Sequence, residues 1–362
     1  MTASVHGPVD VVCLGESMVA FLPTRAGRLA DVPSYLRGIG GAESNVACAL
    51  AAAGHRTRWV GRVGADGFGR HLVEAIGAYG VDTSAVARDP HRPTGVYFRT
   101  ATDRATDAHE VVYYRAGSAA SAMSLATVPY DALWSGRVLH LSGITAALSP
   151  DCLALLHDLT ARRENRPLVS FDVNHRPALW RDSERARVLL DLARGADVVF
   201  VGEDEAEEAW GLRGPDAVRA ALPDPAVLVV KQGAAGAVAF TRGAPPSPRG
   251  GHAPATSSGT GTPDTVVHAP APRVAVTAPV GAGDAFAAGF LAATLRGLDG
   301  RKRLRHGHLW AAAALTVPGD LAPPPRAAHA DRLVALDDDA WGRLHLGPGW
   351  TADGDDQEVR TP

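Results

Sequence analysis

Arg273–Thr294 reads RVAVTAPVGAGDAFAAGFLAAT, and this stretch decides the fold. Its β-branched start predicts a short strand, its glycines a tight turn, and its alanine-rich end a helix that opens on Asp284. Gly281 and Gly283 remove side chains where the backbone must bend or approach a ligand closely. Free N–H groups and the dipole at such a helix start favour an anion, including the charge that develops in phosphoryl transfer. Asp284 would be a base there, although on local grounds alone it is an N-cap.

Short apolar runs rich in β-branched residues alternate with helix-like segments along most of the chain. The expected strands are Val9–Leu14, Trp59–Val63, Val138–Leu141, Leu168–Asp172, Val198–Val201, Val227–Lys231 and Val274–Val276. The expected helices are Ser44–Ala53, Gly69–Tyr79, Pro150–Arg163, Ser183–Arg194 and Glu203–Trp210. This alternation is typical of a mostly parallel sheet with helices on both faces. Val96–Arg99 and Val111–Arg115 differ, and read as an antiparallel pair outside that sheet.

Composition excludes several classes of protein. The chain has 362 residues, 46% of them hydrophobic and 21% charged, as in ordinary globular domains. A formal net charge of −3 gives no electrostatic reason to bind nucleic acid or an anionic membrane. No apolar stretch reaches the roughly 18 residues that span a bilayer. Cys13, Cys48 and Cys152 lie in apolar contexts and indicate reduced core thiols, so we expect a cytoplasmic protein.

Two segments stand outside the alternating pattern. Sixteen of the 22 residues in 243–264 are Gly, Pro, Ser or Thr, a composition that predicts a flexible insert within one domain. Strand character resumes at Val266–Val267, so the insert is not a domain boundary. The end of the chain is acidic and has no apolar period, which predicts a disordered tail over 341–362. Residues 1–340 are therefore expected to form a single domain.

Polar residues gather at three places that could bind a small polar ligand. In 40–47, two glycines precede an alanine-rich helix that carries Asn45, which can donate and accept hydrogen bonds. Tyr113 and Arg115 share one face of a strand and would suit a polyol with a carboxylate. Arg176 belongs to a polar cluster after Leu168–Asp172, where ligands of parallel sheets gather. A plain loop before a buried helix and an ordinary exposed strand remain the alternatives for the first two.

Two further segments admit a nucleotide or metal role, each beside a simpler alternative. Lys231, Gly233 and Gly236 lie where an expected strand runs into a glycine turn, along which a nucleotide could lie; a tight hairpin fits equally. Glu205 belongs to the acidic run 203–205, either a site for metal-bound water or a charged first helical turn. No Walker-type phosphate loop, dinucleotide fingerprint, His-Glu-x-x-His or Gly-x-Ser-x-Gly motif occurs.

Taken in order, these segments resemble the ribokinase (PfkB) family of sugar kinases over roughly residues 9–335. Gly40–Ala53 is similar to the first signature of that family and Pro279–Leu291 to its second. Gly15-Glu16, the run 113–120 and the run 172–180 are similar to the subgroup that phosphorylates 2-keto-3-deoxygluconate. The resemblance implies a ribokinase-like doubly wound α/β domain with a small β lid, built from about 15–38 and 94–116. Lids of this kind pair, which implies a homodimer.

The resemblance also implies roles for individual residues. Asp284 would be the catalytic base, and the amides of Gly281, Ala282, Gly283 and Asp284 the anion hole. The residues in contact with the sugar acid would be Gly41, Asn45, Tyr97, Tyr113, Arg115 and Arg176. Lys231, Gly233 and Gly236 would lie along ATP, and Glu205 would organise Mg²⁺ through water. The chain departs from the family at Gly202, where Asn is usual, and at Ala278, where Asp is usual; these changes bear on metal geometry and on activation by monovalent cations.

The expected function is therefore ATP-dependent phosphorylation of a sugar-acid hydroxyl, first of all 2-keto-3-deoxygluconate to its 6-phosphate. Asp284 would accept the proton of the attacking hydroxyl, and Arg115 with Arg176 would orient the carboxylate. One alternative is a kinase of a neutral sugar such as fructose or ribose. The other is a non-catalytic sugar-binding protein on the same fold, against which the intact Gly-Ala-Gly turn and Asp284 argue.

Overall fold

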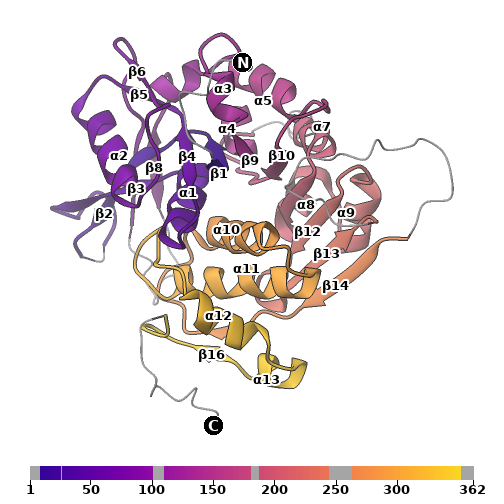
Figure 1. Cartoon of the computed structure of the whole chain (residues 1–362). Coiled ribbons are helices and arrows are strands. Elements are labelled where there is room, and N and C mark those ends of the chain that lie inside the picture. The colour runs from indigo at the N-terminus through magenta and orange to yellow at the C-terminus, as the bar shows by residue number, and fades with distance from the viewer. Residues whose placement is uncertain (1–8, 26, 101–109, 181–186, 244–262, 352–362) are drawn as a thin grey trace.

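A computed structural model describes residues 9–25, 27–100, 110–180, 187–243 and 263–351 (Figure 1). The described residues form a central eight-stranded sheet in the order β14-β13-β12-β11-β10-β9-β1-β4. Its strands are β1 (Val9–Leu14), β4 (Thr57–Val60), β9 (Gly136–Ser142), β10 (Leu168–Asp172), β11 (Val198–Gly202), β12 (Val227–Lys231), β13 (Ala237–Thr241) and β14 (Thr265–Ala269). The neighbours from β4 to β12 pair in parallel, and β13 and β14 add antiparallel strands at one edge.

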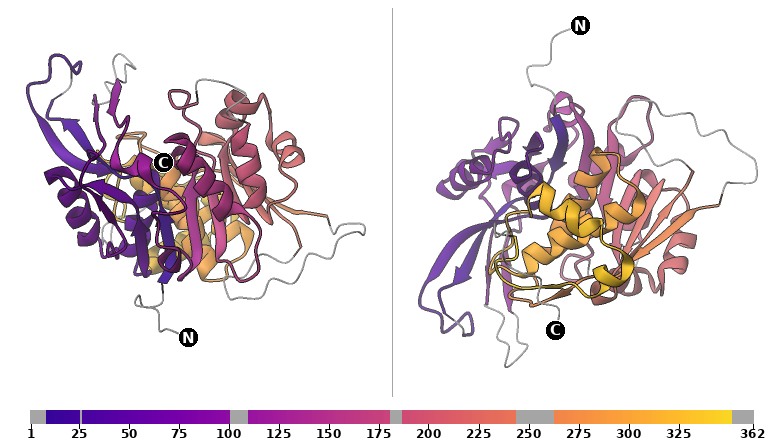
Figure 2. Two further views of the ribbon diagram at one scale, coloured as in Figure 1. Left: turned by 90° about the horizontal axis from the view of Figure 1, so that it is seen from above. Right: turned by 60° about the horizontal axis from the view of Figure 1, so that its bottom comes forward.

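Helices cover both faces of this sheet, as expected (Figures 1 and 2). One face packs against α1 (Ala42–Ala52), α2 (Gly67–Ala78), α10 (Ala282–Leu295), α11 (Gly300–Leu315) and α12 (Ala327–Val334). The other packs against α3 (Tyr130–Leu133), α4 (Gly143–Ala147), α5 (Pro150–Thr160), α7 (Val188–Gly195), α8 (Glu203–Trp210) and α9 (Pro215–Ala221). Strand residues alternate between the two cores: Val11 and Cys13 join the first, Val12 and Leu14 the second. All residues of β1 except Asp10 are buried, which explains its nearly continuous apolar run.

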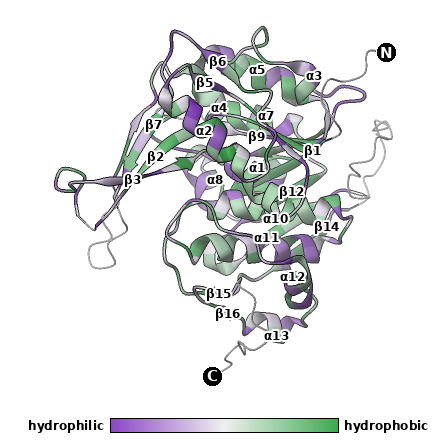
Figure 3. Cartoon of the chain, turned by 60° about the vertical axis from the view of Figure 1, so that its left-hand side comes forward, coloured by the Kyte–Doolittle hydropathy of each residue, from purple (hydrophilic) through white to green (hydrophobic). Residues whose placement is uncertain are grey.

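A second, four-stranded sheet stands beside the central one and projects from it (Figure 3). Its strands, in spatial order, are β3 (Tyr35–Gly40), β2 (Met18–Pro23), β7 (Val96–Arg99) and β8 (Val111–Tyr114). The pairing of β7 with β8 is antiparallel, as the sequence predicts. This small sheet covers the carboxyl end of β1, from which the chain passes directly into β2. The short strands β5 (Arg62–Gly64) and β6 (Ala87–Asp89) form a separate pair.

The stretch Arg273–Thr294 departs from expectation in two respects. Its strand, β15 (Arg273–Val274), pairs with β16 (His345–Leu346) and does not enter the central sheet. Its helix α10 begins at Ala282 with Gly281 as N-cap, so Asp284 is the third helical residue and not the cap. The predicted strand Trp59–Val63 is likewise two strands, β4 and β5, because the chain leaves the sheet at Gly61. A run of β-branched residues predicts that a strand forms, but it does not predict the strand with which it pairs.

The expected tail is wrong for the residues from 341 to 351. Trp341 in α13 (Asp338–Gly342) is fully buried, and the Arg305 guanidinium lies 4.7 Å from its ring centroid. Leu344 and Leu346 are also in the core. The acidic composition of the end of the chain concealed these three apolar anchors, whose burial stabilises the segment by tertiary contact. Residues 352–362 lie outside the described residues.

Most of the predicted insert, residues 244–262, also lies outside the described residues. Its two ends are well placed, because Thr241 at the end of β13 pairs with Thr265 at the start of β14. Thr241 also pairs with Val227, the first residue of β12. Asp264 is held by a 2.6 Å ion pair with Arg219 of α9. The insert therefore joins the sheet at the amino end of β12, opposite the carboxyl end where Lys231 lies.

No helix in the described ranges is long and apolar enough to cross a membrane. Cys13, Cys48 and Cys152 are free and buried, as their apolar contexts predict.

Candidate active site

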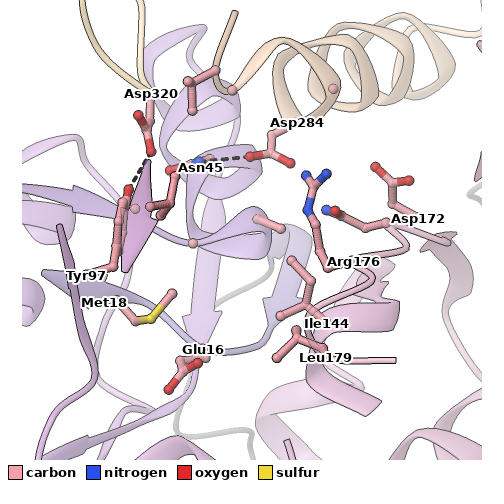
Figure 4. Close-up of a pocket in the computed structure, with 18 of the residues that line it drawn as sticks. Glu16, Met18, Asn45, Tyr97, Ile144, Asp172, Arg176, Leu179, Asp284 and Asp320 are labelled. Carbon is pink, nitrogen blue, oxygen red and sulfur yellow. Dashed lines mark hydrogen bonds between the residues drawn. The ribbon is translucent and has the colours of Figure 1, made fainter. Parts of the chain in front are cut away.

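A pocket of about 440 Å³ opens where the small sheet meets the carboxyl ends of the central strands (Figure 4). Parallel α/β sheets bind ligands at this edge because the loops after the strands converge there. The start of α10 forms one wall of the pocket, and residues of β7 and β8 form another. The sequence-predicted site residues that line it are Gly41, Asn45, Tyr97, Tyr113, Arg115, Arg176, Glu205, Lys231, Gly281, Ala282, Gly283 and Asp284.

Asp284 lies at the centre of the pocket wall, held by the start of another helix. Asn45 Nδ2 of α1 donates a 2.8 Å hydrogen bond to Asp284 Oδ2. Burial is the main cause that raises the pKa of Asp284 to about 7, while the Asn45 hydrogen bond lowers it and the Asp172 carboxylate raises it. Arg176 and Lys231 limit the rise by favouring the charged form. A carboxylate with a pKa near neutrality is suited to accept a proton from a substrate hydroxyl.

The N-terminus of α10 has the geometry of an anion site. Gly281 adopts the left-handed conformation, with φ of 75°, and a Cβ at this position would meet the Asp320 carbonyl oxygen at 2.1 Å. Only glycine fits, for both reasons. The 14-residue helix behind it aims its first N–H groups and its dipole at the pocket. A Cβ on Gly283 would lie 3.7 Å from Lys231 Nζ, so a cation stands beside this turn.

Lys231 and Arg176 bring positive charge to the same end of the pocket. Lys231 Nζ lies 3.2 Å from Asp172 Oδ1, an ion pair between the carboxyl ends of β12 and β10. Burial alone would lower the pKa of Lys231, but Asp172 and Glu205 outweigh it and the pKa is raised. Arg176 is exposed, and its guanidinium points toward Asp284 and Asp172 (Figure 4). This end of the pocket can therefore bind an anionic group, whether a phosphoryl group or a carboxylate.

Glu205 lines the pocket, but one of its carboxylate oxygens is already hydrogen-bonded to the backbone. Its Oε2 accepts a 2.7 Å hydrogen bond from Gly202 N at the start of α8, and burial raises the pKa of its carboxyl. A Cβ on Gly202 would lie 2.4 Å from Asp204 Oδ1, so the acidic turn fills space that a larger residue would need. Within the described residues, no group of three or more His, Cys, Asp or Glu side chains is placed to hold a metal ion. The hydrogen bond to Gly202 agrees with the charged first helical turn, and the metal role of Glu205 stays a prediction.

The small sheet supplies the far end of the pocket. Tyr97 Oη donates a 2.7 Å hydrogen bond to Asp320 Oδ2, and Arg99 forms a 2.9 Å ion pair with Asp320 Oδ1. Arg115 forms a buried ion pair with Glu16. Tyr113 is 47% exposed and, like Arg115, lines the pocket. Two guanidinium groups at this end thus already have carboxylate partners.

Three of the predicted glycines have structural reasons for their identity. A Cβ on Gly41 would lie 2.4 Å from the Glu16 carbonyl oxygen, so Gly41 allows α1 to approach the loop between β1 and β2. Gly233 and Gly236 have φ of 55° and 119° in the turn between β12 and β13, and a Cβ on Gly236 would meet the Ala269 carbonyl at 2.2 Å. These two do not line the pocket in Figure 4. Their positive φ values agree with the hairpin alternative, and their nucleotide role stays a prediction.

Sequence reasoning missed Asp320 and Arg99 and gave Glu16 no role of its own. Asp320 lies in the segment between α11 and α12, without a glycine-rich motif or strand end to mark it. Arg99 ends a short strand and looked like an ordinary β-sheet residue. A preceding glycine, Gly319, was the only local signal, and it is not specific. Asp172 was recognised in its polar cluster, but not as the partner of Lys231.

Comparison with known proteins agrees with this geometry. The family model described as "pfkB family carbohydrate kinase" matches residues 9–327. A 2-dehydro-3-deoxygluconokinase of Thermoproteus tenax is 33% identical over 330 residues, covering 90% of this chain and 94% of the relative. One of Bacillus subtilis (strain 168) is 34% identical over 318 residues, covering 86% and 91%.

Fructokinase-1 of Oryza sativa subsp. japonica is 35% identical over 204 residues, covering 56% of this chain and 62% of the relative. Among solved structures, a PfkB protein from Polaromonas sp. JS666 superposes with a TM-score of 0.72 at 33% identity, covering 91% of this chain and all of that one. The family match extends from β1 to the start of α12 and includes the whole pocket wall around Asp284. The chain belongs to the pfkB family of carbohydrate kinases.

Proposed function

We propose that the protein transfers a phosphoryl group from ATP to the 6-hydroxyl of 2-keto-3-deoxygluconate, a compound also called 2-dehydro-3-deoxygluconate. The observation that carries the chemistry is Asp284. Its carboxylate has a pKa of about 7, is oriented by Asn45, and lies in the first turn of α10 beside the amides of an anion site. A base and an anion site side by side are what hydroxyl attack on a phosphate requires.

In this mechanism the substrate hydroxyl lies against Asp284, which accepts its proton as the oxygen attacks the γ-phosphate. The first N–H groups of α10 face the charge that develops on the transferred group. Arg176 and Lys231, on the same side, attract the phosphates of ATP and hold them in line.

The residues present fit a magnesium ion held mainly by phosphates and water. Asp172 and Glu205 are carboxylates at the phosphoryl end of the pocket, and Mg²⁺ typically uses one or two carboxylates plus substrate phosphates. When bound with ATP, Mg²⁺ neutralises phosphate charge. Asp172 and Glu205 would hold it, directly or through water.

The choice of a sugar acid rests on the relatives and on the far end of the pocket. The two 2-dehydro-3-deoxygluconokinases match at least 86% of this chain at 33–34% identity. The rice fructokinase matches 56% at 35% identity, and a probable fructokinase-6 of Arabidopsis thaliana matches 85% at 29% identity. Tyr113 and Arg115 at the far end can donate to a carboxylate. Arg176, which the sequence analysis assigned to that carboxylate, is instead assigned to the phosphoryl group because it lies beside Asp284 (Figure 4).

A neutral sugar such as fructose is the second candidate, and one observation favours it. Arg99 and Arg115 are both paired with carboxylates, so the far end carries less free positive charge than the sequence suggests. A non-catalytic sugar-binding protein is disfavoured by the family and by the intact base. We further propose that the small sheet mediates a homodimer, supported by exposed Leu36 and Tyr114 on it, and that the protein is cytoplasmic, supported by its free cysteines.

A panel of sugars with ADP release as the readout tests the proposal. 2-Keto-3-deoxygluconate should give the highest kcat/KM, ahead of fructose, ribose and gluconate. Asp284→Asn serves as the control, because it keeps the pocket shape and should lower the turnover of every sugar by about 10²–10⁴-fold. Preference for fructose or ribose would establish the second candidate, and ADP release that no sugar stimulates would contradict a sugar kinase.

A further inference from the structure

Glu16 is a buried acidic residue that the mechanism does not use. It follows β1, is 3% exposed and lines the far end of the pocket (Figure 4). Its Oε1 accepts a 2.6 Å hydrogen bond from Ser118 Oγ, and its Oε2 forms the ion pair with Arg115. A Cβ on Gly95 would lie 3.0 Å from Oε1, so the carboxylate is enclosed on that side too.

The pocket contains four cationic side chains, and three of them are compensated. Arg99 pairs with Asp320, Lys231 with Asp172, and Arg115 with Glu16. Among the described residues that line the pocket, Arg176 is the only cation without an ion pair. Because Arg176 lies at the phosphoryl end, the far end has no uncompensated positive charge (Figure 4).

A guanidinium that is paired with a buried carboxylate is a weaker ligand for a substrate anion. The incoming carboxylate meets the field of Glu16 as well as that of Arg115, and the two largely cancel at a distance. A neutral hydroxyl is affected much less, because it can use a guanidinium N–H or a carboxylate oxygen. On these grounds the pair should weaken the binding of an anion more than the binding of a neutral polyol.

From this we propose that Glu16 is a specificity-determining residue: its negative charge offsets that of Arg115 and sets how strongly the enzyme prefers a sugar acid to a neutral sugar. The proposal deepens the proposed function, since it concerns the same site and assumes that Arg115 faces the carboxylate. It differs from a structural role, in which Glu16 merely anchors the chain after β8. A structural role would change binding of acid and neutral substrates alike.

The test compares the ratio of kcat/KM for 2-keto-3-deoxygluconate to kcat/KM for fructose in four proteins. Glu16→Gln keeps an acceptor for Ser118 but leaves Arg115 uncompensated, so the ratio should rise about tenfold through a lower KM for the acid. Arg115→Gln leaves Glu16 uncompensated, so the ratio should fall about tenfold. The double variant holds two neutral amides and should return near the wild-type ratio.

The double variant protects the test against misfolding, because it buries no unpaired charge. If Glu16→Gln alone does not fold, the comparison of Arg115→Gln with the double variant still measures the effect of the Glu16 charge. Ser118→Ala is the matched control: it removes a hydrogen bond to Glu16 but no charge, so stability should fall while the ratio stays unchanged.

An equal ratio in all four proteins would overturn the proposal and leave Glu16 a structural residue. A ratio that falls in Glu16→Gln would overturn it too, because Glu16 would then serve only to orient Arg115. Failure of the proposed function is separate: a wild-type enzyme that prefers fructose would contradict the substrate, yet the order of the four ratios would still report on Glu16.

Discussion

Asn45 and Asp284 are 239 residues apart in the chain and are joined by a 2.8 Å hydrogen bond. Asn45 lies in the first turn of α1 and Asp284 in the first turn of α10, so the bond ties two helix starts together across the pocket. An amide that donates to a carboxylate favours its charged form and fixes which oxygen remains free. The base is thus positioned by a residue of the other family signature.

Asp284→Asn keeps the size of the side chain but removes proton acceptance. We expect kcat to fall on the order of 10²–10⁴-fold, while the fold survives. ADP release measures kcat, and circular dichroism checks the fold. A variant with nearly normal kcat would mean that another group is the base.

The pH dependence of kcat should report the same carboxyl. Because the pKa of Asp284 is about 7 and the base must be deprotonated, kcat should rise as the pH passes from 6 to 8. Asn45→Ala removes a hydrogen bond that lowers this pKa, so the midpoint should move to higher pH. The pH profile of kcat, recorded for the wild type and for Asn45→Ala with saturating substrates, shows the direction in which the midpoint moves. A midpoint that moves down, or does not move, would contradict the role of Asn45.

Replacing residues 244–262 by a short Gly-Ser link should change neither the KM for ATP nor the melting temperature appreciably. The composition of the segment cannot offset the cost of ordering it. Its ends join the sheet at the amino end of β12, about five residues and roughly 15 Å from Lys231. Thermal unfolding measures the melting temperature, and initial rates at varied ATP concentrations measure the KM. A several-fold rise in the KM for ATP would show that the segment reaches the nucleotide.

Monovalent cations should have little effect on activity. Ala278 is buried three residues before Gly281 and offers no side-chain oxygen, and the following Pro279 restricts its backbone. A hard cation needs several oxygen ligands, and loss of a charged one weakens such a site. Activity should therefore be the same in KCl and in tetramethylammonium chloride at constant ionic strength. A saturable, several-fold increase with K⁺ would show that carbonyl groups or another carboxylate supply the site.

The segment that contains α13 should contribute to the stability of the fold. Trp341→Ala removes a fully buried indole that stacks under Arg305, and should cost about 3–5 kcal/mol of unfolding free energy. Truncation after residue 351 should cost almost nothing by comparison. Urea unfolding of the Trp341→Ala variant and of the truncated protein measures both effects. If the whole segment from residue 341 were a disordered tail, neither change would alter the free energy of unfolding.

The parts of the fold that could be predicted from sequence are those whose signal is local. β10 and β12 were predicted with their observed bounds, because strands covered on both faces consist mainly of apolar residues and each of these two ends on a charged one, Asp172 and Lys231. The glycine turn before α10 was evident because only glycine tolerates the conformation of residue 281. The ends of α1 and α2 were displaced by one or two residues and the C-terminal end of α5 by three, whereas the bounds of α8 were predicted as observed.

The rest depends on contacts that no local pattern contains. Asp320 is held in the pocket wall by a hydrogen bond from Tyr97 and an ion pair with Arg99, both residues of the small sheet. Arg115 looked like a free cation, since nothing in sequence shows that Glu16, about a hundred residues earlier, would be its partner. Trp341 was assigned to a disordered tail because the sequence does not show that Arg305 and the core pack against its ring.

The close approach of Asp320 to Gly281 has a consequence for how this enzyme can drift in evolution. Any codon change at position 281 that adds a side chain meets both an unfavourable φ and a main-chain carbonyl, which no second mutation in a side chain can move aside. The segment that carries Asp320 must therefore be inherited together with this glycine. In a saturation library selected for growth on the sugar, position 281 should be depleted of every alternative, while neighbouring Ala282 tolerates small replacements.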